Sequence, residues 1–264
     1  MTANVSTVKK EKRTWRSVFR AFGRAHKKAS VQMEDSAPLL NHLNELRIRI
    51  FKAFLGLMVA TGISFAFSAQ VINYLAIPIG GMANLVSIEL TENIAIFMKV
   101  SLLGGFVLGM PVIVYQIMAF ILPGLKHSER GWLLIMVPFA SLLFATGVAF
   151  TWFVMLPTAI PFLTNFMGIT TQVRPENYFK FVTSLMFWIG VCFEMPLVIM
   201  FLAKMKFVTA KQLAGGWRYA TVVMAIVAAS VTPTVDPVNM GLVMAPLMGL
   251  YAISIVLAAI VGRG

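Results

Sequence analysis

The residues with the clearest chemical potential stand where the first apolar stretch begins, at 42–49 (His-Leu-Asn-Glu-Leu-Arg-Ile-Arg). On a helix of about 100° per residue, His42, Glu45 and Arg49 share one polar face, and Arg47 projects on the other side of an apolar stripe. Such a helix lies against a membrane or a bundle and displays a charged edge at the water boundary. A Glu45–Arg49 contact at i,i+4 is also an ordinary feature of an interfacial anchor.

Two ionisable residues fall inside later apolar runs. Glu194 lies ten residues before Lys204, about 15 Å along a helix and therefore near the middle of a membrane. A carboxyl there is costly when charged and is usually functional, although a structural hydrogen bond near Pro196 is the other interpretation. Lys99 lies about two turns inside the second run, where its ammonium either snorkels to the interface or faces a water-filled outer cavity.

Composition determines which elements must position these groups. Hydrophobic residues make up 59% of the 264 residues and charged residues only 12%, whereas soluble domains carry about 25% charged residues. The chain is therefore a polytopic membrane protein. The apolar runs predict spans at about 48–67, 94–122, 132–156, 179–204, 219–231 and 238–261. The fifth run covers only about 20 Å against a hydrocarbon core of about 30 Å.

Charge predicts the orientation of these spans. Residues 1–52 hold 12 of the 22 Lys and Arg. Placing the N-terminus in the cytoplasm puts 19 of them on that side and only Arg174 and Lys180 on the other, which predicts six spans with both termini inside. Residues 1–36 are then a basic cytoplasmic extension beside anionic lipid, and 37–264 form the membrane domain. No folded basic domain lies outside the membrane, so nucleic acid is not an expected partner.

Proline indicates the turns and kinks. Pro78 is expected in the first outer loop, Pro157, Pro161 and Pro175 in the second, and Asp236 in a proline-bounded outer turn, where an Asp before proline is a common turn former. Four prolines fall inside spans and permit kinks, which favours a curved wall over a straight bundle; they are Pro111, Pro138, Pro196 and Pro246.

Glu129, in the first inner loop, is the second acid of interest. By itself it is a solvated loop acid or a helix-start charge. The inner face is strongly basic, and apart from three tail acids only Glu45 and Glu129 supply carboxylates there. Two carboxylates kept on a cationic surface suit a ligand with paired arginines, because carboxylate binds guanidinium in a bidentate fork.

The sequence contains no recognisable catalytic apparatus. Cys192 is the single cysteine, and the three histidines are widely spaced. No serine–histidine set, metal-ligand cluster or phosphate loop is present, so neither an enzyme nor a cofactor is expected. A proton- or ion-coupled solute transporter using Glu194 and Lys99 is the alternative function, but transporters usually show internal repeats, and none is visible here.

Several blocks together resemble the TatC family, the signal-peptide receptor and core subunit of the twin-arginine protein translocase. They are 42–49, Thr-Glu at 91–92 with Phe97 and Lys99, Pro-Val-Ile-Val-Tyr-Gln at 111–116, Phe-Ile-Leu-Pro-Gly-Leu at 120–125 with Glu129, Phe-Glu-Met-Pro at 193–196, and Thr-Pro…Asp-Pro at 232–237. Their order and spacing cover nearly the whole chain after about residue 36. The basic N-terminal extension is longer than is usual in the family.

The resemblance implies a concave wall of six helices, the last two too short to span. It implies that Glu45 and Glu129 hold the consecutive arginines of a signal peptide, supported by Arg47 and Arg49. It also implies that Glu194 faces the cavity where single-span partners of the TatA and TatB type insert a polar residue. The expected protein is a receptor and scaffold that self-associates among lipids in the inner membrane of a prokaryote and exports folded cargo using the proton motive force.

Overall fold

The computed structural model describes residues 42–121, 131–164, 173–232 and 237–262. The chain divides into two units, Met1–Phe51 and Lys52–Gly264. The described residues are almost entirely helical, and the β-pairing among them is an isolated bridge between Leu85 and Val173. The prediction of an all-α membrane protein is therefore confirmed.

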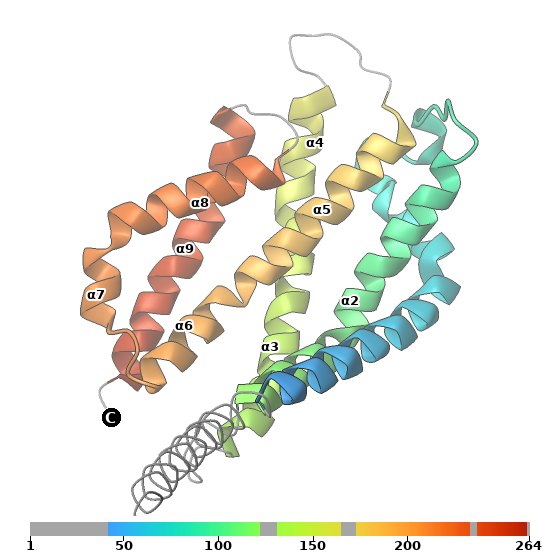
Figure 1. Cartoon of the computed structure of the whole chain (residues 1–264). Coiled ribbons are helices and arrows are strands. Elements are labelled where there is room, and N and C mark those ends of the chain that lie inside the picture. Colours follow the sequence, from blue (N-terminus) through green and yellow to red (C-terminus); the bar gives the residue numbers. More distant parts are fainter. Residues whose placement is uncertain (1–41, 122–130, 165–172, 233–236, 263–264) are drawn as a thin grey trace, which may run out of the picture. The chain divides into compact units, whose positions relative to one another are not determined.

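The helices follow the predicted apolar runs (Figure 1). The first helix covers residues 42–75 and is followed by two short 3-10 turns, η1 and η2. The third long helix is continuous in three parts, because α3 runs through the π turn η5 into α4. The bounds are η1 Ile77–Ile79, η2 Met82–Asn84, α2 Glu92–Ile121, α3 Gly131–Phe150, η5 Thr151–Met155, α4 Leu156–Thr164, α5 Pro175–Phe193, α6 Met195–Lys204, α7 Ala210–Gly215, α8 Trp217–Val231 and α9 Pro237–Val261.

Five of the six predicted spans correspond to helices long enough to cross a membrane, and the predicted span at 219–231 corresponds to a shorter helix. Among the described residues, five helices are long and apolar enough to cross a membrane. The helix α8 has 15 residues, about 22 Å, so the prediction of a short fifth run is confirmed. The helix α9 has 25 residues, about 37 Å, so the expectation that both last helices are short is wrong for α9. Its apolar run is continuous, and Pro246 lies inside the helix without ending it.

The expected loop position of two prolines is also wrong. Pro157 and Pro161 lie within α4, so the third long helix extends to Thr164. Each proline removes one backbone hydrogen bond. Burial of apolar residues of the same turns, Leu156 and Ile160, offsets that loss. Pro175, by contrast, occupies the first turn of α5, where its missing N–H costs nothing.

Small residues bring the first helix and α2 into close contact. Ser68 and Ser101 share a hydrogen bond of 2.6 Å between their hydroxyl oxygens. A methyl group added at Gly105 would lie 2.7 Å from the Cα of Thr61, and one added at Gly104 would lie 2.2 Å from a serine hydroxyl. Membrane helices associate through such small residues because lipid supplies no hydrophobic force between them.

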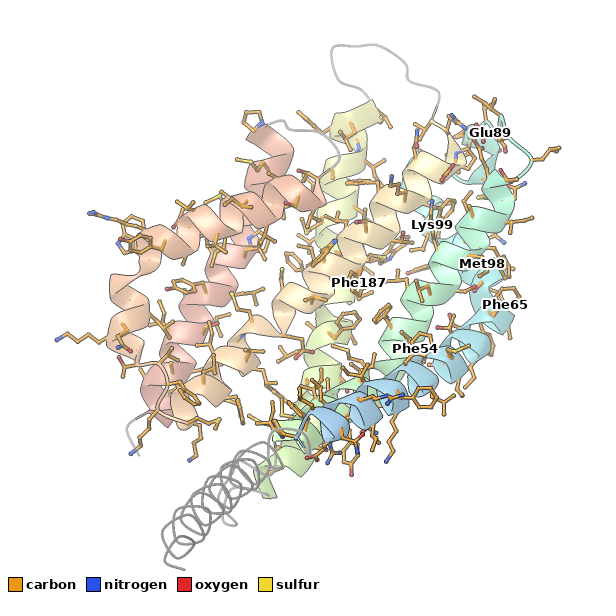
Figure 2. All side chains as sticks on the ribbon, in the orientation of Figure 1. Phe54, Phe65, Glu89, Met98, Lys99 and Phe187 are labelled. Atoms are coloured by element: carbon orange, nitrogen blue, oxygen red, sulfur yellow. The ribbon has the colours of Figure 1, made fainter. Side chains whose placement is uncertain are left out.

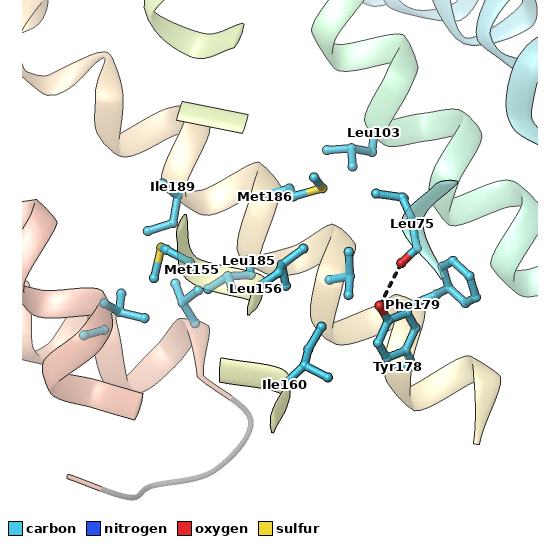
Figure 3. Close-up of a cluster of buried hydrophobic side chains, with 14 of the residues drawn as sticks. Leu75, Leu103, Met155, Leu156, Ile160, Tyr178, Phe179, Leu185, Met186 and Ile189 are labelled. Carbon is cyan, nitrogen blue, oxygen red and sulfur yellow. Dashed lines mark hydrogen bonds between the residues drawn. The ribbon is translucent and has the colours of Figure 1, made fainter. Parts of the chain in front are cut away.

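The remaining helices form two groups joined at Glu194. The helices α2, α3 and α5 pack on one another, whereas α6 and α8 pack on α9. The helix α5 ends one residue before Glu194 and α6 begins one residue after it, with Pro196 in the first turn of α6. The break at Glu194 therefore lets one long apolar segment pack with both groups, α5 with the first and α6 with the second. A buried cluster connects them, including Leu103, Met186 and Ile189 (Figure 3).

Large apolar side chains cover much of the surface. Phe54, Phe65 and Met98 project outward from the first helix and α2 (Figure 2). Soluble proteins rarely expose contiguous apolar area on this scale. Together with the five long apolar helices, this surface shows a multi-pass membrane protein.

Candidate functional site

Glu45 lies one turn after the start of the first helix and accepts two hydrogen bonds from Arg49. The Nη2–Oε1 distance is 2.7 Å and the Nε–Oε1 distance is 3.0 Å. Both bonds use the same carboxylate oxygen, so Oε2 makes no hydrogen bond within the described part of the chain. The pair is partly exposed and Arg47 is exposed. The helix therefore presents a carboxylate that is oriented by one guanidinium and still has acceptor capacity for another.

The other sequence-predicted residues are distributed differently. Glu129 and Asp236 lie outside the described residues. Pro78 is in the 3-10 turn η1, which packs against α4. The turn ends at Gly80 with φ 86° and continues through Gly81 with φ 98°, a left-handed conformation that glycine adopts without steric cost. The connection after the first helix thus begins with an ordered turn.

Glu194 occupies the break between α5 and α6. Its backbone N–H donates to Val191 O at 3.1 Å, and its carbonyl accepts from Val198 N at 3.0 Å. The side-chain atom Oε1 is buried and has no hydrogen-bond partner among the described residues. A buried acceptor without a donor is destabilising by about 1–3 kcal/mol. The break therefore holds a carboxyl group that can accept a hydrogen bond from outside the chain.

An ion-pair cluster around buried Glu92 joins the beginning of α2 to the segment before α5. Glu92 is buried, and its Oε1 accepts from both Arg174 Nε, at 2.9 Å, and Arg174 Nη2. Its Oε2 accepts from Ser87 Oγ at 3.0 Å and from Ile88 N at 3.3 Å. Arg174 also donates to Glu89 at 3.0 Å. The hydrogen bond to Glu92 raises the pKa of Arg174 above its ordinary value, so the guanidinium keeps its charge.

Lys99 has a partner on a different helix. Its Nζ lies 2.9 Å from Glu176 Oε1 in the first turn of α5, and both side chains are about one-third exposed. Figure 2 shows Lys99 below Glu89, on the same side of the bundle. The two ion pairs, Arg174–Glu92 and Lys99–Glu176, hold α2 and α5 together at this end.

Two further contacts join the end of the first helix and the loop after it to α5 and the segment before it. Val86 N donates to Val173 O at 3.3 Å beside the Leu85–Val173 bridge. The buried hydroxyl of Tyr178 donates to Leu75 O at 2.7 Å (Figure 3). Sequence reasoning missed this cluster of ion pairs and loop contacts. The signal available was the group of acids and bases flanking the second and fourth spans: Glu89, Glu92, Lys99, Arg174, Glu176 and Lys180.

No metal centre is formed by the part of the chain that the structure describes, since nowhere in it do three His, Cys, Asp or Glu side chains come together. The polar positions are instead carboxylates with guanidinium or ammonium partners, and one carboxyl with an unpaired oxygen at a helix break. Glu45 and Glu194 are the carboxyl groups here that can accept further hydrogen bonds.

Comparison with known proteins assigns the fold. Residues 41–246 match the family model described as Sec-independent protein translocase protein (TatC). The chain belongs to the TatC family. It is 37% identical over 234 residues to TatC of Deinococcus radiodurans, covering 85% of this chain and 87% of that one. It is also 37% identical over 228 residues to chloroplastic TATC of Arabidopsis thaliana, covering 85% and 67%.

Solved structures of the family have the same fold. A crystal structure described as Twin Arginine Translocase Receptor TatC in DDM superposes with a TM-score of 0.75 at 34% identity, covering 82% of this chain and 99% of that one. A second TatC structure gives a TM-score of 0.72 at 33% identity. Membership of the TatC family makes this chain a component of the Sec-independent, twin-arginine protein translocase, and it does not favour the solute-transporter alternative.

Proposed function

We propose that this TatC-family protein is the receptor and scaffold subunit that binds twin-arginine signal peptides at the inner membrane of a prokaryote. The observation that carries the proposal is Glu45, held by Arg49 at the beginning of the first helix with one carboxylate oxygen unbonded among the described residues. A second guanidinium can donate a charge-assisted hydrogen bond to that oxygen.

Glu45 and Glu129 each receive one of two consecutive arginines in this proposal. Arg49 orients the Glu45 carboxylate, and exposed Arg47 lies beside this pair in the sequence and supports the site in this proposal. Removing one charged partner of a desolvated pair typically costs about 2–5 kcal/mol in binding. Replacement of either glutamate by alanine is therefore expected to weaken peptide binding by at least about thirtyfold.

The test is binding of a labelled twin-arginine peptide to the purified chain in detergent. Glu45→Ala and Glu129→Ala should each lose affinity, whereas Glu11→Ala, which removes a tail carboxylate, should bind like the parent. A peptide with Lys-Lys in place of Arg-Arg should bind the parent weakly, since an ammonium lacks the planar array of N–H donors that a guanidinium presents to a carboxylate. Parent-like affinity in both Glu45→Ala and Glu129→Ala would show that the recognition site lies elsewhere.

Glu194 is proposed to accept a hydrogen bond from a polar residue of TatA- and TatB-type single-span partners. The buried Oε1 at the α5–α6 break supports this role, because a donor from a partner helix would remove an unsatisfied acceptor. Recruited partners and further copies of this chain would then form a transient passage for folded cargo, driven by the proton motive force.

The proposed orientation places both termini in the cytoplasm. In a Cys192→Ser background, a single cysteine at Ser128 should react with a membrane-impermeant maleimide only from the cytoplasmic side. One at Asn84, which is exposed in the first outer loop, should react only from the opposite side. Labelling of both positions from the same side would contradict an odd number of crossings between them.

A further inference from the structure

The segment between α6 and the first turn of α8 combines exposed cations with exposed aromatic rings. Lys206, Lys211 and Arg218 are exposed, and Phe207, Trp217 and Tyr219 lie beside them in the sequence and are exposed as well. Residues 195–235 contain no Asp or Glu. The segment therefore has a positive surface that its own stretch of chain does not neutralise.

Contacts with α9 place the beginning of α8 far from the end of that long helix. Tyr251 OH donates to Leu213 O in α7 at 2.7 Å, and Thr221 Oγ1 donates to Met248 Sδ at 3.7 Å. Tyr251 is ten residues before Val261, where α9 ends, which is about 15 Å along the helix. Arg218 lies between Leu213 and Thr221 in the chain, so its backbone is level with the middle part of α9 rather than with its end.

The short length of α8 also indicates that Arg218 does not reach the level at which α9 ends. Its 15 residues cover about 22 Å of a core of about 30 Å even when upright. Figure 1 shows α8 inclined to α9, which shortens its vertical extent further. A bilayer that covered the whole apolar length of α9 would also surround the first turn of α8, which would place Arg218 within one leaflet instead of in water.

A guanidinium at that depth needs a counter-charge. The salt bridges among the described residues involve Arg49, Lys99 and Arg174 but not Arg218. The Arg218 guanidinium lies over the Trp217 ring, with 5.9 Å between Cζ and the ring centroid. An anion from outside the described residues can supply that counter-charge, and the phosphate of its lipids is the anion that a membrane offers in quantity.

We propose that Arg218, with Lys211 and Trp217, binds the phosphate of an anionic phospholipid whose headgroup is drawn into the bilayer at the beginning of α8. The planar guanidinium matches two phosphate oxygens, and the exposed ammonium of Lys211 supplies a second cation that favours an anionic over a zwitterionic headgroup. Trp217 places an amphipathic ring at the same level.

The face of α8 beyond Arg218 suits the rest of a lipid molecule. Val222, Val223 and Ile226 are all more than half exposed along this helix. They present an apolar surface on which acyl chains can lie while the phosphate remains at the basic end. A short helix with a cation at its end and aliphatic side chains along its exposed face thins the bilayer locally and fixes a lipid there. This inference does not depend on signal-peptide binding.

The experiment titrates the purified, delipidated full chain in detergent with phosphatidylglycerol, phosphatidylcholine or inorganic phosphate and follows retained lipid by native mass spectrometry. The parent should bind phosphatidylglycerol more tightly than phosphatidylcholine and should not respond to inorganic phosphate. Arg218→Gln should reduce phosphatidylglycerol affinity by about tenfold, and Arg218→Lys by less, because the charge remains but the fork is lost. Lys180→Gln, which removes an exposed cation on α5, should bind like the parent.

Each arm can overturn the proposal. Equal phosphatidylglycerol affinity in Arg218→Gln and Lys180→Gln would remove Arg218 from the site. Equal binding of the two lipids by the parent would exclude recognition of headgroup charge, and competition by inorganic phosphate at similar concentration would identify a free-anion site instead. If Arg218→Gln does not fold, Arg218→Lys and the lipid comparison on the parent still decide the outcome.

Discussion

Substitution of Gly105 by alanine tests whether the first helix and α2 are held together by close approach of their backbones. The added methyl carbon would lie 2.2 Å from Thr61 Oγ1, 2.7 Å from Thr61 Cα and 2.9 Å from Thr61 Cβ. Carbon atoms that touch without strain normally lie about 3.5–4.0 Å apart. A hydroxyl can rotate away, but a backbone carbon cannot, so the two helices must separate by roughly 1 Å.

The energetic cost follows from two effects. Overpacking of this kind destabilises by about 1–3 kcal/mol. Separation would also strain the buried Ser68–Ser101 hydrogen bond of 2.6 Å, whose loss costs about 1 kcal/mol. Alanine has a better helix propensity than glycine by about 0.8–1.0 kcal/mol, which opposes both effects. We therefore expect Gly105→Ala to lower the free energy of unfolding by about 1–3 kcal/mol.

Gly62 provides the matched control on the first helix. A methyl group added there meets nothing within 4 Å, so Gly62→Ala should leave stability unchanged or raise it by up to about 1 kcal/mol. The measurement is the unfolding free energy from titration of detergent-solubilised protein with sodium dodecyl sulfate, followed by tryptophan fluorescence. The reasoning is refuted if Gly105→Ala is as stable as Gly62→Ala.

Two double variants separate clashes with the backbone from clashes with side chains. Thr61→Ala should not rescue Gly105→Ala, because the backbone of residue 61 would still lie 2.7 Å from the added methyl carbon. Ser64→Ala should partly rescue Gly104→Ala, because the nearest atom to the added methyl is the Ser64 hydroxyl, at 2.2 Å, and the next, Cβ, is at 3.2 Å. The opposite pattern of rescue would show that the helix spacing is adjustable at Gly105 and rigid at Gly104.

Two further predictions concern polar residues inside the membrane domain. Lys99→Gln and Glu176→Gln should each lower the thermal unfolding temperature slightly. The exchanged pair, Lys99→Glu with Glu176→Lys, should restore it, because an ammonium and a carboxylate would meet again. An exchanged pair less stable than either single variant would exclude this ion pair as the source of the effect. Glu194→Gln should retain substantial transport of a twin-arginine cargo into membrane vesicles, because the amide keeps the hydrogen-bonding capacity. Glu194→Ala should keep signal-peptide binding but lose partner assembly and transport. Proton-coupled solute uptake that Glu194→Gln abolishes would instead favour a transporter.

The helical segments could be predicted from sequence because their determinants are local. Span positions follow from continuous apolar runs, and the i,i+4 relation between Glu45 and Arg49 follows from helix periodicity alone. The short α8 was also predictable, since its length depends only on the number of apolar residues between polar flanks. The depth of Glu194 along its segment follows from the same arithmetic.

Tertiary structure decided what depends on partners distant in the chain. Lys99 meets Glu176, 77 residues away, and Arg174 meets Glu92, 82 residues away. No pattern within one helix specifies those pairs, because they form only when the packing of α2 on α5 brings the charges together. Packing also kept Pro161 helical, where buried neighbours offset the missing hydrogen bond. Sequence alone therefore determined which segments enter the membrane, and long-range packing determined which polar groups within them are paired and which, like Glu194 Oε1, have no partner among the described residues.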